Sequence, residues 1–148
     1  MVDGDLPARA SRPLAPSPAG FALRPLPVRR PLREAEVGAN VCSPVLHDGH
    51  LYWISDRNQT AYCLNAKDGS VVYEEKVDVQ PYASALFADG RLYVPMRNSG
   101  TLVLAAQPTF KKLAHNRLKD RSIFDASPIV NGGKLILRSN HNLYCFSR

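Results

Sequence analysis

The sequence predicts an all-β fold: a partial β-propeller of about two and a half four-stranded antiparallel blades behind a disordered N-terminal tail. The main observation is a pattern of a small residue, a serine, apolar residues and a glycine turn that occurs three times, with its serines at Ser43, Ser84 and Ser127. These serines are 41 and 43 residues apart, and four short strands in about 40 residues is the period of a propeller blade. In addition, Asn, Asp and Gly interrupt the chain too often for helices.

Composition allows one packed domain. The chain has 148 residues, a net charge of +6, and 45% hydrophobic residues. No apolar run reaches the ~18–20 residues needed to cross a bilayer, so no transmembrane segment is predicted. Three cysteines are too few for a disulfide scaffold, and the positive charge permits an anionic partner without identifying one.

Residues 1–40 are predicted to form a Pro/Arg-rich disordered tail. They hold seven of the twelve prolines and six arginines, and neither a strand nor a helix period is present. The start lacks the basic segment followed by an apolar segment that marks a secretory signal peptide. The arginines are not clustered as in a nucleic-acid-binding arm, so no nucleic-acid partner is expected.

Residues 41–148 are predicted to form the blades, in the units 41–80, 81–121 and 122–148. In each unit a short apolar strand leads into Asp-Gly or Gly-Gly, a pair that supplies the positive φ angles of a tight hairpin. Second strands are predicted at 51–55, 92–96 and 135–139. Third strands are predicted at 61–65, 101–105 and 142–146, and fourth strands at 71–77 and 111–118. The third unit stops after its third strand, as at the end of a larger propeller.

The turn from Leu64 to Tyr73 carries a family resemblance. Its sequence Leu-Asn-Ala-Lys-Asp-Gly-Ser-Val-Val-Tyr is similar to the signature of pyrroloquinoline-quinone-type (PQQ-like) propeller repeats, and so is the Ser-Pro-Val-x-x-Asp-Gly-x-Leu-Tyr stretch that begins at Ser43. Tyr73 stands where that family has a tryptophan that docks between blades. The resemblance covers about residues 41–148 and extends to the propellers of outer-membrane-protein assembly factors. It implies the periplasm or cell envelope, but the chain carries no signal peptide and its localisation stays unassigned.

These patterns favour a non-catalytic scaffold or protein-interaction segment, the C-terminal part of a larger PQQ-like repeat protein. A protein or peptide partner is expected, and open blade edges allow self-association. Two alternatives remain: the C-terminal fragment of a quinoprotein dehydrogenase, or the sensor propeller of a multidomain kinase-type protein. No catalytic residue, metal site or cofactor is predicted.

The candidate binding residues lie in polar loops between the second and third strands. Repeated arginine and asparagine at one rim of a propeller can hold an acidic or peptide ligand, although asparagine is also common in plain turns. The candidates are Arg57, Asn58, Arg97, Asn98, Arg138 and Asn140.

Other reactive residue types are assigned structural roles. His47 and His50 flank a turn that we expect to be solvated rather than a metal site. The three cysteines are predicted to be small buried hydrophobes. The repeat serines lack a nucleophile elbow and are expected to be small residues crowded around the propeller axis. Asp125 is expected to have a loop role.

Overall fold

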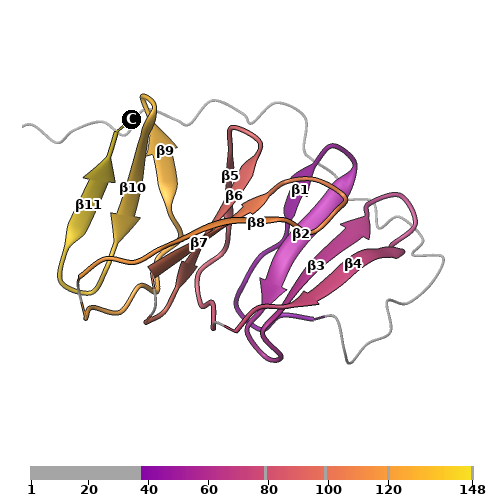
Figure 1. The fold of residues 1–148 in the computed structure, drawn as a ribbon, viewed down its shortest axis with the longest axis horizontal. Coiled ribbons are helices and arrows are strands. Elements are labelled where there is room, and N and C mark those ends of the chain that lie inside the picture. The colour runs from indigo at the N-terminus through magenta and orange to yellow at the C-terminus, as the bar shows by residue number, and fades with distance from the viewer. Residues whose placement is uncertain (1–37, 79, 99, 120, 148) are drawn as a thin grey trace, which may run out of the picture.

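The computed structural model describes residues 38–78, 80–98, 100–119 and 121–147. All regular elements in these ranges are strands, in three antiparallel sheets that stand side by side like the blades of a fan (Figure 1). The predicted all-β partial propeller is therefore confirmed for these residues. Most of the predicted tail, residues 1–37, lies outside the described residues.

The three sheets follow one another along the chain, and each is a simple meander. Blade 1 contains β1 (Val45–His47), β2 (His50–Ser55), β3 (Thr60–Asn65) and β4 (Val71–Lys76). Blade 2 contains β5 (Leu86–Ala88), β6 (Arg91–Met96), β7 (Gly100–Ala105) and β8 (Lys112–Asn116). Blade 3 contains β9 (Ile129–Asn131), β10 (Lys134–Arg138) and β11 (Leu143–Phe146).

The hairpin between the first two strands of each blade is the predicted tight turn. Both central residues have positive φ in blade 1, at 45° for Asp48 and 71° for Gly49, and blade 2 repeats this with 49° and 69° at 89 and 90. Blade 3 uses Gly132 and Gly133, with φ of 54° and 73°. Such turns match the twist of the strands that they join, which explains why Asp-Gly and Gly-Gly mark every unit.

The turn that carries the family signature is held by its own polar groups. The Asn65 N–H donates to the Ser70 carbonyl at 2.9 Å, and the Gly69 N–H donates back to the Asn65 carbonyl at 2.8 Å. Oδ1 of Asp68 accepts bonds from the Ser70 hydroxyl at 2.7 Å and from the Ser70 N–H at 2.9 Å. These two bonds stabilise the carboxylate and lower the pKa of Asp68.

The main core lies between blades 1 and 2. It combines buried side chains of β2 and β3 with those of β6 and β7: Tyr52, Ile54, Ala61, Cys63, Leu92, Val94, Met96, Leu102 and Leu104. Tyr73 packs its ring edge-on against Phe110 of blade 2, with 5.7 Å between ring centroids. It therefore docks between blades, where the resemblance places the family's tryptophan. His47 stacks on Phe87 across the same junction at 4.0 Å, so it is half-buried rather than fully solvated.

The prediction for the cysteines was wrong at one position. Cys42 and Cys63 are buried, but Cys145 is exposed. Cys63 and Cys145 occupy matching strand positions, and blade 2 covers Cys63. Cys145 lies on the face of blade 3 that is turned away from blade 2, where no described residue covers it.

Candidate partner-binding rim

All six candidate residues lie at one end of their sheets. They belong to the loops β2–β3, β6–β7 and β10–β11, except Arg138, which is the last residue of β10. Because these loops connect the same pair of strands in each blade, they share one rim of the propeller.

The hairpin register sets which loop residues correspond. The position seven residues after the turn glycines at 49, 90 and 133 holds Asp56, Arg97 and Asn140. Asp56 and Arg97 directly follow β2 and β6, whereas Asn140 is the second residue after β10. Arg97 therefore matches Asp56 and not Arg57. The Arg-Asn pairs at 57–58 and 97–98 are thus offset by one position between the two blades, and the β6–β7 loop at 97–99 is one residue shorter than the β2–β3 loop at 56–59.

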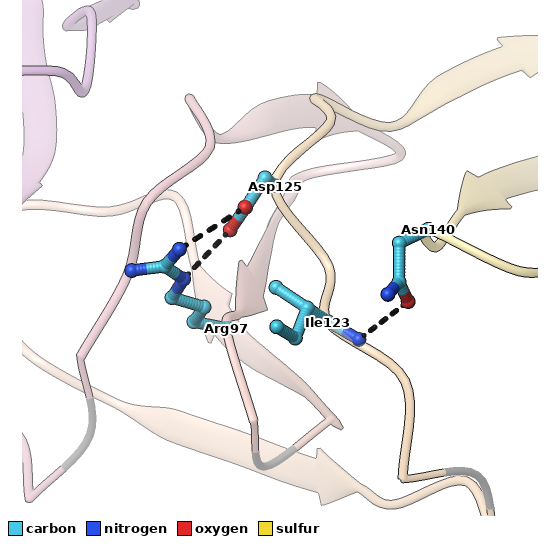
Figure 2. A network of polar contacts seen from close by, with 4 residues as sticks. All are labelled: Arg97, Ile123, Asp125 and Asn140. Carbon is cyan, nitrogen blue, oxygen red and sulfur yellow. Dashed lines mark hydrogen bonds and ion pairs between the residues drawn. The ribbon is translucent and has the colours of Figure 1, made fainter.

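In blades 1 and 3 the side chain at this position holds the chain segment that leads into the same blade. In blade 1, Oδ1 of Asp56 accepts from the Asn40 N–H at 2.7 Å. In blade 3, Oδ1 of Asn140 accepts from the Ile123 N–H at 2.9 Å, as Figure 2 shows, and the Asn140 N–H donates to the Ile123 carbonyl at 3.0 Å. Asn140 thus positions the loop as well as facing the rim.

Arg97 uses its side chain to join blade 2 to blade 3. Its Nε lies 3.1 Å from Oδ1 of Asp125 and its Nη2 lies 3.4 Å from Oδ2, so the ion pair is two-pronged (Figure 2). The guanidinium also stands over the ring of Tyr82 at 4.9 Å, and the Arg97 carbonyl accepts from the Phe124 N–H at 3.0 Å. Asp125, expected to have a loop role, is therefore an ion-pair partner between blades.

A shallow hollow of about 210 Å³ opens beside this ion pair. Its lining comes from blade 3 and the segment that leads into it: Ile123, Asp125, Ala126, Arg138, Ser139 and Asn140. Arg138 is exposed, and its guanidinium makes no hydrogen bond or ion pair with any described residue. Since Arg97 already neutralises Asp125, the hollow keeps a net positive group that can pair with a carboxylate.

The structure does not bring the blade 1 candidates into this hollow. Asn58 is held against strands of its own blade, because its Nδ2 donates to the Tyr62 hydroxyl of β3 at 2.8 Å and its carbonyl accepts from Lys76 Nζ of β4 at 2.8 Å. Arg57 and Asn98 are exposed in their loops and do not line the hollow. Partner binding by any of the six residues stays a prediction.

Sequence reasoning missed the task of the repeat serines, which link neighbouring blades. The Ser43 N–H donates to Oγ of Ser84 at 2.8 Å, and the Ser84 N–H donates to Oγ of Ser127 at 3.2 Å. We call this chain of bonds the serine ladder. The regular spacing of the serines is its only signal in the sequence.

Among the described residues, no three His, Cys, Asp or Glu side chains gather closely enough to hold a metal ion. Trp53, the one tryptophan, stacks on Tyr62 of its own blade at 5.3 Å. Within the same ranges, no helix is long and apolar enough to cross a membrane.

Comparison with known proteins identifies the fold. No family model and no curated protein matches the sequence. Among solved structures, BamB from Moraxella catarrhalis superimposes with a TM-score of 0.58 at 17% identity, over 70% of this chain and 32% of that one. The quinohemoprotein alcohol dehydrogenase from Comamonas testosteroni gives 0.54 at 18% identity, over 69% of this chain and 17% of that one. A europium-containing methanol dehydrogenase gives 0.50 at 12% identity, over 66% of this chain and 19% of that one.

These likenesses confirm the resemblance to PQQ-like propellers at the level of the fold. The chain spans about a third of the length of BamB, and less of the two dehydrogenases. Two of the three neighbours are named as enzymes, so the fold alone does not decide whether this chain takes part in catalysis.

Proposed function

We propose that the chain is a non-catalytic propeller scaffold that binds an acidic segment of a protein partner at the rim of blades 2 and 3. The observation that carries this proposal is the hollow beside the Arg97–Asp125 ion pair. Arg138 supplies a cation that is not engaged with the described residues, and Asn140 lines the hollow with an amide suited to a peptide backbone. BamB, unlike the other two neighbours, is not named as an enzyme.

The ion pair makes the site selective for acidic ligands. Without Arg97, the carboxylate of Asp125 would stand in the hollow with only Arg138 to balance it, and it would repel an incoming acid. With Arg97 in place the charges of the three side chains sum to one positive charge. Arg97 therefore positions the carboxylate of Asp125 and neutralises its charge, and Arg138 contacts the ligand.

A fluorescent hexaglutamate peptide and a hexalysine peptide, both at low salt, test the site. We expect the acidic peptide alone to bind, and Arg138→Ala to weaken its binding about tenfold, as for a charge-assisted hydrogen bond. The matched control is Arg91→Ala, because Arg91 is exposed at the opposite end of blade 2. An equal loss of peptide affinity in both variants would show that the overall positive charge drives binding, and it would contradict a defined rim site.

A fragment of a quinoprotein dehydrogenase is the second candidate, since two of the structural neighbours are dehydrogenases. The described residues do not supply the ligand cluster that a bound metal ion needs, which makes this candidate the weaker of the two. The test is dye-linked alcohol oxidation by the purified chain with added quinone and calcium. Turnover above the rate of quinone alone would favour this candidate over the scaffold.

A further inference from the structure

The charges of the chain are divided unequally between its repeats. Unit 41–80 carries three basic and six acidic residues, whereas unit 81–121 carries seven basic and two acidic residues. The difference is concentrated in the outermost strand of each blade and its flanks. In blade 1 the segment 71–78 holds three acidic residues beside one lysine, and in blade 2 the segment 111–121 holds five basic residues beside one aspartate. Two blades of one fold therefore present outer edges of opposite net charge.

The five basic side chains of the segment 111–121 are accessible to a partner. They are Lys111, Lys112, Arg117, Lys119 and Arg121, and we call them the basic edge. All five are exposed, and none of them forms an ion pair with a described residue. The basic edge can therefore attract an anionic partner, most strongly at low salt.

The backbone beside these side chains is a free edge of the sheet. β8 is the last strand of blade 2, and β7 is its only partner among the described strands. One side of its backbone therefore offers N–H and C=O groups to an added strand, and a peptide backbone carries the matching groups. A nucleic acid has no such backbone, and the segment 111–121 contains no Phe, Tyr or Trp on which its bases could stack. The surface thus favours an acidic peptide segment.

The basic edge leads to the hollow at the rim. β8 ends at Asn116, which pairs with Thr101 near the start of β7, so this end of β8 lies at the rim. Residues 117–121 continue along the chain towards Ile123, which lines the hollow together with Arg138. An acidic segment bound in the hollow can therefore continue onto the free edge of β8.

We propose that the acidic segment of the partner extends from the hollow onto β8, where it adds as an outer strand and its carboxylates pair with the basic edge. This inference rests on the proposed function, because one segment occupies both places. Charge also decides between the blades: Glu74 and Glu75 on β4, the corresponding outer strand of blade 1, repel an acidic strand. The partner is thus directed to blade 2 rather than to blade 1.

A peptide of alternating glutamate and threonine tests the surface at low salt. About twelve residues are enough to reach both places, since a strand advances by ~3.3 Å per residue. We expect the double variant Lys112→Gln, Arg117→Gln to bind this peptide about fivefold more weakly, as for the loss of two exposed ion pairs.

The matched control is the double variant Arg91→Gln, Lys134→Gln. It removes the same charge from exposed positions at the hairpin ends of blades 2 and 3, away from β8, and it should leave the affinity nearly unchanged. Circular dichroism checks that both double variants are folded. Equal weakening in the two would show that net charge alone drives binding, and it overturns the proposal.

A peptide of alternating glutamate and proline tests the added strand. It carries the same charge, but proline has no N–H to donate to a neighbouring strand. Amide hydrogen exchange should slow at the β8 amides that face away from β7 with the glutamate-threonine peptide, and not with the proline peptide. Unchanged exchange at these amides in the bound chain overturns strand addition. Equal slowing by a deoxythymidine oligonucleotide would show that any polyanion suffices, and it overturns the proposal as well.

Arg138→Ala separates this inference from the proposed function. If hexaglutamate binding depends on Arg138 but the glutamate-threonine peptide does not respond to the basic-edge variant, the rim site stands and the extension onto β8 is overturned. If the basic-edge variant weakens the longer peptide while Arg138→Ala changes the binding of neither peptide, the rim site is overturned and the strand on β8 is supported.

Discussion

The two junctions between the three blades are built from different chemistry. Blades 1 and 2 meet through a continuous apolar core and two aromatic contacts, Tyr73–Phe110 and His47–Phe87. Blades 2 and 3 are joined by the serine link and the half-exposed Arg97–Asp125 ion pair, beside the buried apolar side chains Val103 and Leu137. One repeat therefore supports both a junction formed by a continuous apolar core and a junction in which an exposed ion pair accompanies the apolar packing. Since burial stabilises more than exposed ion pairs, we expect blade 3 to open before blades 1 and 2 separate.

Truncating matched leucines should give the largest effect. Leu92 and Leu135 occupy the same strand position, but Leu92 is buried in the main core whereas Leu135 is half-buried. We expect Leu92→Ala to lower the free energy of unfolding by about 3 kcal/mol and Leu135→Ala by about 1 kcal/mol. Urea unfolding followed by circular dichroism measures both. Equal losses would mean that the two junctions are equally well packed.

Alkaline pH should weaken the first junction. Burial, with a smaller contribution from the charge of Asp56, raises the pKa of the Cys42 thiol from 9.0 to about 11. Burial likewise raises the pKa values of Tyr52 and Tyr73. The unfolded chain releases these protons first, so stability is full below about pH 9 and falls as the pH rises towards 11.

Replacing Cys42 isolates its part of this loss. Cys42→Ala, the residue found at the matching positions 83 and 126, should make the fall between pH 8.5 and 10.5 shallower by about 1 kcal/mol, allowing for water near the thiol. Urea unfolding at the two pH values gives the comparison. An unchanged slope would show that this thiol ionises alike in the folded and unfolded chain.

The serine link is common to both junctions, and removing it should lower the free energy of unfolding by the same amount in each. Ser84→Ala and Ser127→Ala each remove one acceptor, and we expect each to lower stability by about 1 kcal/mol. Amide hydrogen exchange distinguishes them: the Ser43 amide should exchange faster in the first variant and the Ser84 amide in the second. Faster exchange at both amides in either variant would mean that the links are not independent.

Of the contacts compared, the Arg97–Asp125 ion pair should contribute least to the free energy of unfolding. Arg97 and Asp125 are 42% and 39% exposed, so Arg97→Ala should lower stability by less than about 1 kcal/mol, an effect that high salt removes. Faster exchange should be confined to blade 3. A loss that persists in high salt would instead indicate that the packing of Arg97 on Tyr82 matters more than its charge.

Labelling of the thiols compares the two ends of the molecule without changing its stability. Cys145 is exposed, whereas Cys42 and Cys63 are buried and their pKa values are raised. A thiol reagent at pH 8 should therefore modify one thiol quickly in the native chain and three after unfolding.

Local signals were enough to predict the strands, because Asp-Gly turns and alternating apolar residues act within a few positions. The second and third strands lie within one or two residues of their predicted bounds. The exposure of Cys145 could not be read in this way, since it depends on whether another blade covers that face. The Arg-Asn pairs at 57–58 and 97–98 look equivalent in the sequence, but the strand pairing places them one position apart because the second loop is a residue shorter. The Arg97–Asp125 pair joins residues 28 apart in two different blades, beyond the reach of any local pattern.

The serine ladder also bears on how a gene for such a protein can grow. Each unit carries both halves of the link, a backbone donor and a hydroxyl acceptor on one and the same residue. A unit added by tandem duplication therefore already carries the donor and the acceptor that bond it to the unit before it and to the unit after it. No second mutation elsewhere is required, so blade number can change in single steps while the loops at the rim diverge freely.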